Sequence, residues 1–246
     1  MNSLRRMLNV LDLFRPDQPV IDVDVICKEL GYTPASAYRY LRELGGVGLL
    51  VRLPHGYALG PRVIELEHQM SDHDPLIVQS RDLVRDLCEQ TGLDVLISEW
   101  YGGAVVNVLI QRGTDEGPVG GGRGRSIDLF QTATARVVLA YLLPRQIRKV
   151  FDAHAGKPEW EHLRLDWKEF SKGLLAIRKQ GFCISESELH AGRMGVAAPI
   201  FDEKKRVLGS MTLVGRTERF RSFEESRLCQ LITDAAAELT ARIARQ

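Results

Sequence analysis

Side chains that can hydrogen-bond to phosphates and to base edges recur along one short segment near the N-terminus. Hydroxyl and guanidinium groups suit those acceptors, and small side chains let a helix backbone approach a groove closely. Between positions 33 and 57 the sequence holds three arginines and one glutamate, whereas the formal net charge of the whole chain is only +1. The residues of this segment that we expect to contact DNA are Thr33, Ala35, Ser36, Tyr38, Arg39 and Arg42.

A second group of candidate contacts follows at Arg52, His55 and Tyr57, around the turn Pro54-His55-Gly56. These side chains are suited to the flanking backbone or the minor groove, and we assign Arg52 to phosphate contact. We predict instead that bases are read by Ser36, Tyr38 and Arg39. Base contacts give specificity, whereas phosphate contacts give register. The alternative is that these arginines lie on the solvated face of an ordinary amphipathic helix.

Few residues of the sequence have the types and the spacing that a catalytic site requires. The glycine-rich run from Gly117 to Gly124 lacks the Gly-Lys-Ser/Thr ending of a phosphate loop and predicts a turn-rich loop. Glu186 and Glu188 could pair as an acid and a base, but two exposed glutamates near a loop are far more often simply solvated. The six histidines form no His-Glu-x-x-His motif, so we expect no metal site and no cofactor.

The cysteine pattern bears on compartment and on redox chemistry. Four cysteines lie far apart along the chain, without the close pairs typical of a disulfide framework or of a sensor with a resolving thiol. They predict reduced thiols in a cytoplasmic protein. The longest central apolar run, from Val137 to Leu143, is far shorter than the ~20 residues of a membrane span, so no membrane partner is expected.

Helix signals position the first candidate contacts. Apolar residues recur every three or four positions from Leu4 to Phe14, which predicts a helix. A second helix is predicted from an N-cap at Asp22 to Leu30, and Thr33-Pro34 begins a third that ends at Gly45-Gly46. Two short strands then flank the turn at 54–56. This order of helices and hairpin is that of a winged helix-turn-helix, in which Tyr40, Leu41 and Leu44 belong to the core.

The rest of the chain predicts a linker helix and a second, α+β domain. Helical sequence runs from Arg62 to about Gln90 with a break near Ser71 to Pro75. Strands and helices then interleave without strict alternation, which favours α+β over a doubly wound parallel sheet. The predicted strands are 94–100, 105–111, 196–201 and 207–214, and the predicted helices are 133–143, 144–153, 167–179 and 222–245.

The sequence resembles the IclR family of bacterial transcriptional regulators over nearly its whole length. The N-terminal resemblance rests on GYTPASAYRYLREL and GLLVRLPHGYALGPRVIEL. The C-terminal resemblance rests on GRGRSIDLFQTATARVVLAYLLP and on the segment that holds a Gly-x-x-x-x-Ala-Ala-Pro element at Gly192 to Pro199. The resemblance implies a GAF-like effector domain, and a dimer or tetramer on operator DNA with the linker helix in the dimer contact.

A ligand pocket between the sheet and the segment around Thr132 is a further implication of the resemblance. A helix N-terminus there would favour an organic acid. The family often has His at position 130, Gly-Lys at 135–136, an acidic residue at 185 and Cys at 195, and these departures suggest a roomier, more apolar pocket for an aromatic or bulky acid. The implied lining is Phe130, Thr132, Ala133, Thr134, Ser185, Met194, Gly195, Thr212 and Val214.

The sequence therefore predicts a DNA-binding domain at residues 1–62, a linker helix at 63–75 and an effector-binding domain at 76–246. The expected function is regulation of transcription through operator DNA, modulated by a small carboxylic acid or aromatic metabolite, without catalysis. Two alternatives place an enzyme or a redox-sensing regulator on the C-terminal domain.

Overall fold

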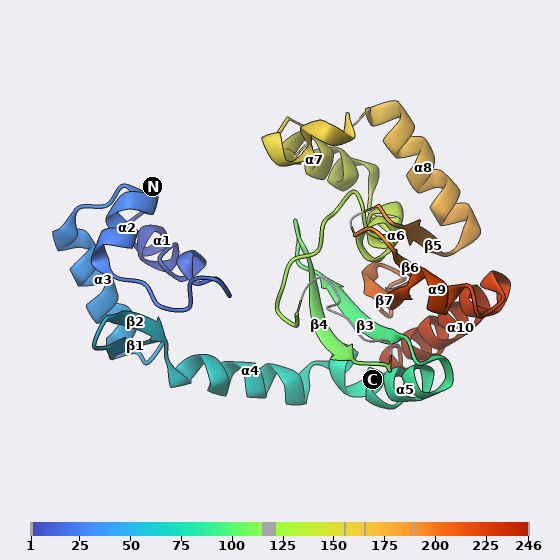
Figure 1. Cartoon of the computed structure of the whole chain (residues 1–246), viewed down its shortest axis with the longest axis horizontal. Coiled ribbons are helices and arrows are strands. Elements are labelled where there is room, and N and C mark those ends of the chain that lie inside the picture. The colour runs from blue at the N-terminus through green and yellow to red at the C-terminus, as the bar shows by residue number, and fades with distance from the viewer. Residues whose placement is uncertain (1, 115–121, 155, 165, 189, 246) are drawn as a thin grey trace. The chain divides into compact units, whose positions relative to one another are not determined.

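The chain forms two compact units, residues 1–74 and 75–246 (Figure 1). The computed structural model describes residues 2–114, 122–154, 156–164, 166–188 and 190–245. The elements of the first unit are α1 (Ser3–Leu8), a 3-10 turn (Leu11–Leu13), α2 (Val23–Leu30), α3 (Pro34–Gly46), β1 (Leu50–Leu53), β2 (Gly56–Leu59) and α4 (Pro61–His73).

Local capping chemistry fixes the two helices at the centre of this unit. The Asp22 side chain accepts a hydrogen bond from the Val25 amide at 2.9 Å and begins α2, which ends at Gly31 in the left-handed conformation. Thr33 caps α3, with Pro34 at its first position. One apolar stripe of α3 is buried, as predicted for its core positions, and it consists of Ala37, Tyr40, Leu41 and Leu44.

The β1–β2 hairpin is held against the start of α2 by a close backbone approach. Ile21 and Tyr57 exchange backbone hydrogen bonds of 2.9 and 2.7 Å. A Cβ at Gly56 would lie 2.6 Å from the Ile21 carbonyl oxygen, and the φ of Gly56 is +147°. Only glycine fits there, so the sequence fixes the position of this wing relative to α2.

The second unit is built on a five-stranded antiparallel sheet with the order β4-β3-β7-β6-β5. Its strands are β3 (Asp94–Trp100), β4 (Val105–Gln111), β5 (Cys183–Glu186), β6 (Arg193–Phe201) and β7 (Val207–Arg216). Its helices are α5 (Pro75–Thr91), α6 (Ala133–Tyr141), α7 (Pro144–His154), a 3-10 helix (Pro158–Leu163), α8 (Trp167–Gln180), α9 (Thr217–Phe220) and α10 (Glu225–Ile243).

Helices cover both faces of this sheet and create two separate apolar cores. On one face α5 and α10 pack together against the strands, around residues such as Ile97, Leu213 and Ile232. On the other face α6 lies across β6 and β7, with α8 against its far side. The second core forms there, around Val138, Leu139 and Ala197.

The sequence-based predictions differ most from the structure at three places. The first helix is shorter than predicted, because α1 ends at Leu8 and a 3-10 turn replaces its second half. The helix predicted over 222–245 begins at Glu225, and the separate helix α9 precedes it. Strand β5 was not predicted, because it has only four residues and lies at the sheet edge.

Candidate functional site

The exposed face of α3 carries most of the predicted DNA contacts. Tyr38 is 60% exposed, and Arg39 and Arg42 are exposed beside it. Thr33 and Ala35 are exposed at the helix start, and Ser36 is half-buried. A single surface of the helix therefore presents one aromatic and two basic side chains, opposite the buried stripe.

Some of these groups already have partners within the chain. The Thr33 hydroxyl accepts a hydrogen bond from the Ser36 amide at 3.4 Å and donates one to the Ser36 hydroxyl at 3.1 Å. The Arg42 guanidinium lies 3.3 Å from a Glu43 carboxylate oxygen. The Arg39 guanidinium lies over the Tyr40 ring, 5.2 Å from its centroid. Thr33 therefore acts first as a helix cap, and Arg42 is partly neutralised.

A hollow of about 230 Å³ separates α3 from the wing and brings together three predicted contacts, Tyr38, Arg52 and Tyr57. His55 is exposed at the turn of the wing but does not line this hollow. Asp22 and Asp24 also line it, and sequence reasoning assigned neither of them a contact. The sequence could have placed Asp24 at this surface, because Asp24 lies two residues after the N-cap of α2.

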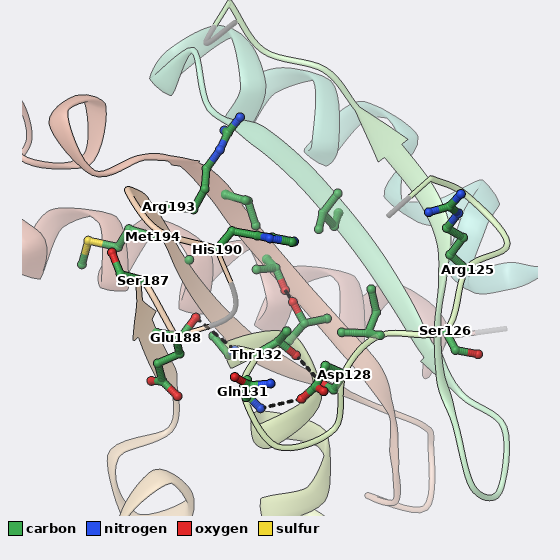
Figure 2. Close-up of a pocket in the computed structure, with 18 residues that line it drawn as sticks. Arg125, Ser126, Asp128, Gln131, Thr132, Ser187, Glu188, His190, Arg193 and Met194 are labelled. Atoms are coloured by element: carbon green, nitrogen blue, oxygen red, sulfur yellow. Dashed lines mark hydrogen bonds between the residues drawn. The ribbon is translucent and has the colours of Figure 1, made fainter. Parts of the chain in front are cut away.

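A cavity of about 310 Å³ lies in the C-terminal unit, between the N-terminus of α6 and the strands β3, β5, β6 and β7 (Figure 2). It brings together the predicted lining residues except Phe130. Those at the cavity are Thr132, Ala133, Thr134, Ser185, Met194, Gly195, Thr212 and Val214.

Hydroxyl groups and backbone amides form the inner wall of this cavity. The Ala133 amide donates to the Ser185 hydroxyl at 3.2 Å, and the Ala135 amide donates to the Thr132 hydroxyl at 3.3 Å. The hydroxyls of Thr134 and Thr212 lie 3.1 Å apart and are buried. The first turn of α6 thus directs the positive end of its dipole at the cavity, an arrangement that favours an anion.

Two arginines and a histidine also line the cavity. His190 and Arg193 extend from the β5–β6 side, and Arg125 lies across the cavity from them (Figure 2). The two acidic side chains at the cavity are both engaged. Glu188 pairs with Arg136 of α6, and the Asp128 carboxylate accepts hydrogen bonds from Gln131, Phe130 and Trp160. The electrostatic balance therefore also favours an anionic ligand.

Phe130 does not line the cavity, which corrects the implied lining. Its ring is 6% exposed and packs edge-on against Phe151, Trp160 and Phe170, with centroids 6.5, 5.4 and 5.4 Å away. An apolar ring gains more among these aromatic side chains of the α7–α8 region than beside the hydroxyls of the cavity. Phe130 therefore belongs to this core and not to the cavity lining.

Asp128 connects the cavity to this aromatic cluster, and sequence reasoning missed it. One carboxylate oxygen accepts from the Phe130 and Gln131 amides at 2.9 and 2.7 Å, and the other accepts from the Trp160 indole at 2.8 Å. Arg125, Gln131, Glu188, His190 and Arg193 were missed as well. All except Arg193, the first residue of β6, lie in connections beside α6, β5 and β6, where strand and helix periodicity gives no direction for a side chain.

Other candidate chemistry finds little support in the part of the chain that is described. No group of three or more His, Cys, Asp or Glu side chains there has the geometry to hold a metal ion. None of its helices combines the length and apolar character that crossing a membrane requires. Residues 117–121 of the glycine-rich run lie outside the described residues.

Comparisons with known proteins agree on one family. The family profile for the bacterial transcriptional regulator IclR C-terminal domain matches residues 68–241, and that for the IclR helix-turn-helix domain matches residues 3–54. The Pca operon regulatory protein of Acinetobacter baylyi is 24% identical over 242 residues, which cover 96% of this chain and 87% of that protein.

Solved structures show the same fold. An IclR transcriptional regulator from Silicibacter sp. TM1040 has a TM-score of 0.83 at 24% identity, covering 99% of this chain and 96% of that one. An IclR homologue from Microbacterium hydrocarbonoxydans, solved with 4-hydroxybenzoate, has a TM-score of 0.81 at 16% identity and covers 100% of both chains. These likenesses confirm the predicted fold class. The two profiles together span most of the chain, and the protein therefore belongs to the IclR family of bacterial transcriptional regulators.

Proposed function

We propose that this protein binds operator DNA through α3 and the wing, and that a small organic acid in the C-terminal cavity changes that binding. The exposed Tyr38 and Arg39 on α3 and Arg52 on the wing support the first half of the proposal. Such a helix fits the major groove, where arginine pairs with guanine. A protein that acts on chromosomal DNA works in the cytoplasm of a bacterium.

The ligand that best fits the cavity is a monocyclic aromatic carboxylate. The observation that carries this proposal is the α6 N-terminus, whose amides and flanking hydroxyls face a space of about 310 Å³. That volume is near the lower end of small-molecule sites, which favours a single ring. A carboxylate would face Thr132, Thr134 and Ser185, and the ring would lie against Leu96, Ile127 and Val214. The relative that binds 4-hydroxybenzoate supports the same ligand class.

A ligand can change DNA binding only if it binds one arrangement of the protein better than another. We infer that the acid favours a state in which the loop at Glu188 and the segment at Asp128 close on α6, since both segments line the cavity. By thermodynamic linkage, operator DNA must then alter the affinity for the acid by the same factor.

We further propose that the protein acts as a homo-oligomer. Ile64, Leu66 and Met70 of α4 are 71, 44 and 43% exposed. Leu66 and Met70 are four residues apart and share one face of the helix, and an exposed apolar face of this kind is a candidate contact surface. A twofold dimer would present two α3 helices to two half-sites of an operator. Light scattering on the full chain tests this: a monomeric mass at micromolar concentration would contradict the proposal.

We propose ligand binding rather than turnover or redox sensing, and three of the four thiols argue against a redox role. Burial raises the pKa of Cys88, of Cys183 and of Cys229, the last to about 11. A reactive or redox-sensing cysteine needs a thiolate near neutral pH, and these thiols are protonated there.

The decisive experiment is a gel shift with the DNA upstream of the protein's own gene, titrated with random competitor DNA and then with 4-hydroxybenzoate and benzoate. We expect a complex that survives excess competitor and whose stability changes with one of the acids. A complex that competitor removes equally would contradict operator recognition. A specific complex that no monocyclic aromatic carboxylate affects would contradict the ligand class alone.

A further inference from the structure

A second cavity lies on the opposite face of the same end of the sheet. It has a volume of about 210 Å³ and is bordered by β5, β6, α9 and α10. Its deepest lining residues are Val196, Phe220 and Leu228, which are 1, 4 and 2% exposed. All three belong to the core between the sheet and α10, so the cavity penetrates that core.

Strand alternation explains why two cavities lie back to back. In the β5–β6 pair, Ser185 is opposite Gly195 and Ile184 is opposite Val196. Paired residues share a face of a sheet and their neighbours take the other face. Ser185 and Gly195 therefore line the polar cavity beside α6, while Ile184 and Val196 line the apolar cavity beside α10. Met194 lies at the rim and lines both.

The chemistry of the second cavity is opposite to that of the first. Its inner surface consists of apolar side chains and the Cys229 thiol. At its rim the Arg221 guanidinium is 3.1 Å from a Glu186 carboxylate oxygen, so its charge is neutralised. Glu225 adds a negative charge there. A carboxylate would lose its hydration in this space and gain no cation in return, whereas an uncharged ring would gain by burial.

We propose that this cavity is a second ligand site, which takes a neutral monocyclic aromatic molecule of about the size of toluene. A dry apolar cavity of about 150 Å³ already binds benzene, so a volume of about 210 Å³ is sufficient for one substituted ring. The site does not depend on the function of the α6 cavity, because its lining comes from the other face of the sheet. Met194 gives the two sites a shared wall.

Toluene is the probe for the full-length protein, with saturation-transfer NMR as the binding assay. We expect a saturable toluene signal in the wild-type protein that benzoate does not displace, because benzoate is charged. Cys229→Phe should abolish the signal by occupying the cavity from α10. Cys229→Leu offers the same test with a smaller side chain that helices favour, should the larger one impair folding.

Cys27→Ala is the matched control, because Cys27 is a half-buried thiol of the N-terminal unit, remote in sequence from both cavities. It should leave the toluene signal unchanged. A wild-type protein that gives no saturable signal would overturn the proposal. Equal toluene signals in wild type and in both folded Cys229 variants would overturn it as well. A change of oligomeric mass in those variants, together with absent toluene binding, would also overturn it and would assign the cavity to a protein contact.

Discussion

Position 195 offers the sharpest test of the ligand cavity, because a side chain added there projects from β6 into the cavity. The nearest atoms to a Cβ at Gly195 are the Leu213 carbonyl oxygen, the Ser185 hydroxyl and a Val214 methyl group, each at 3.6 Å. These are ordinary contacts. Glycine within a strand costs about 0.5–1 kcal/mol of stability relative to alanine. Gly195→Ala should therefore raise the free energy of unfolding by about 0.5–1 kcal/mol.

Gly195→Leu should separate ligand binding from folding and from DNA binding. The leucine side chain would occupy space beside Ser185 and Thr212, where the ligand is proposed to lie. In the wild type, an acid at a hundred times its dissociation constant should raise the free energy of unfolding by about 2.7 kcal/mol. The leucine variant should show no such increase, although its operator gel shift persists.

Urea unfolding with and without the acid measures both effects, and Gly209→Ala provides the contrast. A Cβ at Gly209 would lie 1.9 Å from the Ser98 carbonyl oxygen, so the same substitution on the neighbouring strand should be strongly destabilising. The reasoning fails if Gly195→Ala destabilises the protein as Gly209→Ala does. It also fails if Gly195→Leu folds and keeps the full stabilisation by the acid.

Three further predictions concern other parts of the molecule. Arg39→Ala should weaken operator binding and relax sequence preference, whereas Arg52→Ala should weaken operator and random DNA alike; equal losses for Arg39→Ala in a competition gel shift would contradict base reading. The hydrogen bond from Arg242 lowers the pKa of Asp82, so the stability that Asp82 contributes is present above its unfolded-state pKa and is lost as pH falls through the lower folded-state value. In urea unfolding, the free energy of unfolding of the wild type should therefore exceed that of Asp82→Asn at neutral pH and equal it in strong acid. A difference that persists in acid would refute the stabilising role of the Asp82–Arg242 pair. Ligand binding beside Asp128 should change the fluorescence of Trp160, whose indole donates to that carboxylate at 2.8 Å, and Trp160→Phe should remove this response; an unchanged ligand-induced signal in that variant would assign it to Trp100 or Trp167.

The sequence predicted the helices α2 and α3 of the N-terminal unit well, because their boundaries depend on local chemistry. Asp22, Gly31 and Thr33 act as caps wherever they occur before or after a helix, so their positions alone define α2 and the start of α3. Strand β5 escaped prediction for the opposite reason. Four residues at a sheet edge carry too short a pattern to indicate a strand, and their extended conformation depends on pairing with β6.

The cavity was predictable where a strand or helix fixes the side-chain direction, and not elsewhere. Thr132, Ser185 and Thr212 were found because each belongs to an element whose end or face the family pattern defines. Phe130 was placed wrongly because it precedes α6 in a connection, where the Asp128 turn decides the direction of its ring. His190 and Arg193 were missed because they lie in or beside the β5–β6 connection.

The alternation of β6 gives the C-terminal unit two separate chemistries from one short segment. Gly195 leaves room beside the hydroxyls and amides at the start of α6, where a carboxylate is favoured. Val196, the next residue, faces the other way into an apolar space without a free cation among the described lining residues, where only a neutral ring is favoured. Because both residues belong to one strand, a shift of β6 that widens one cavity must move a wall of the other. Coupling between an acid and a neutral ring in this protein would act through the strands β5 and β6, which line both cavities, and it would act equally in both directions.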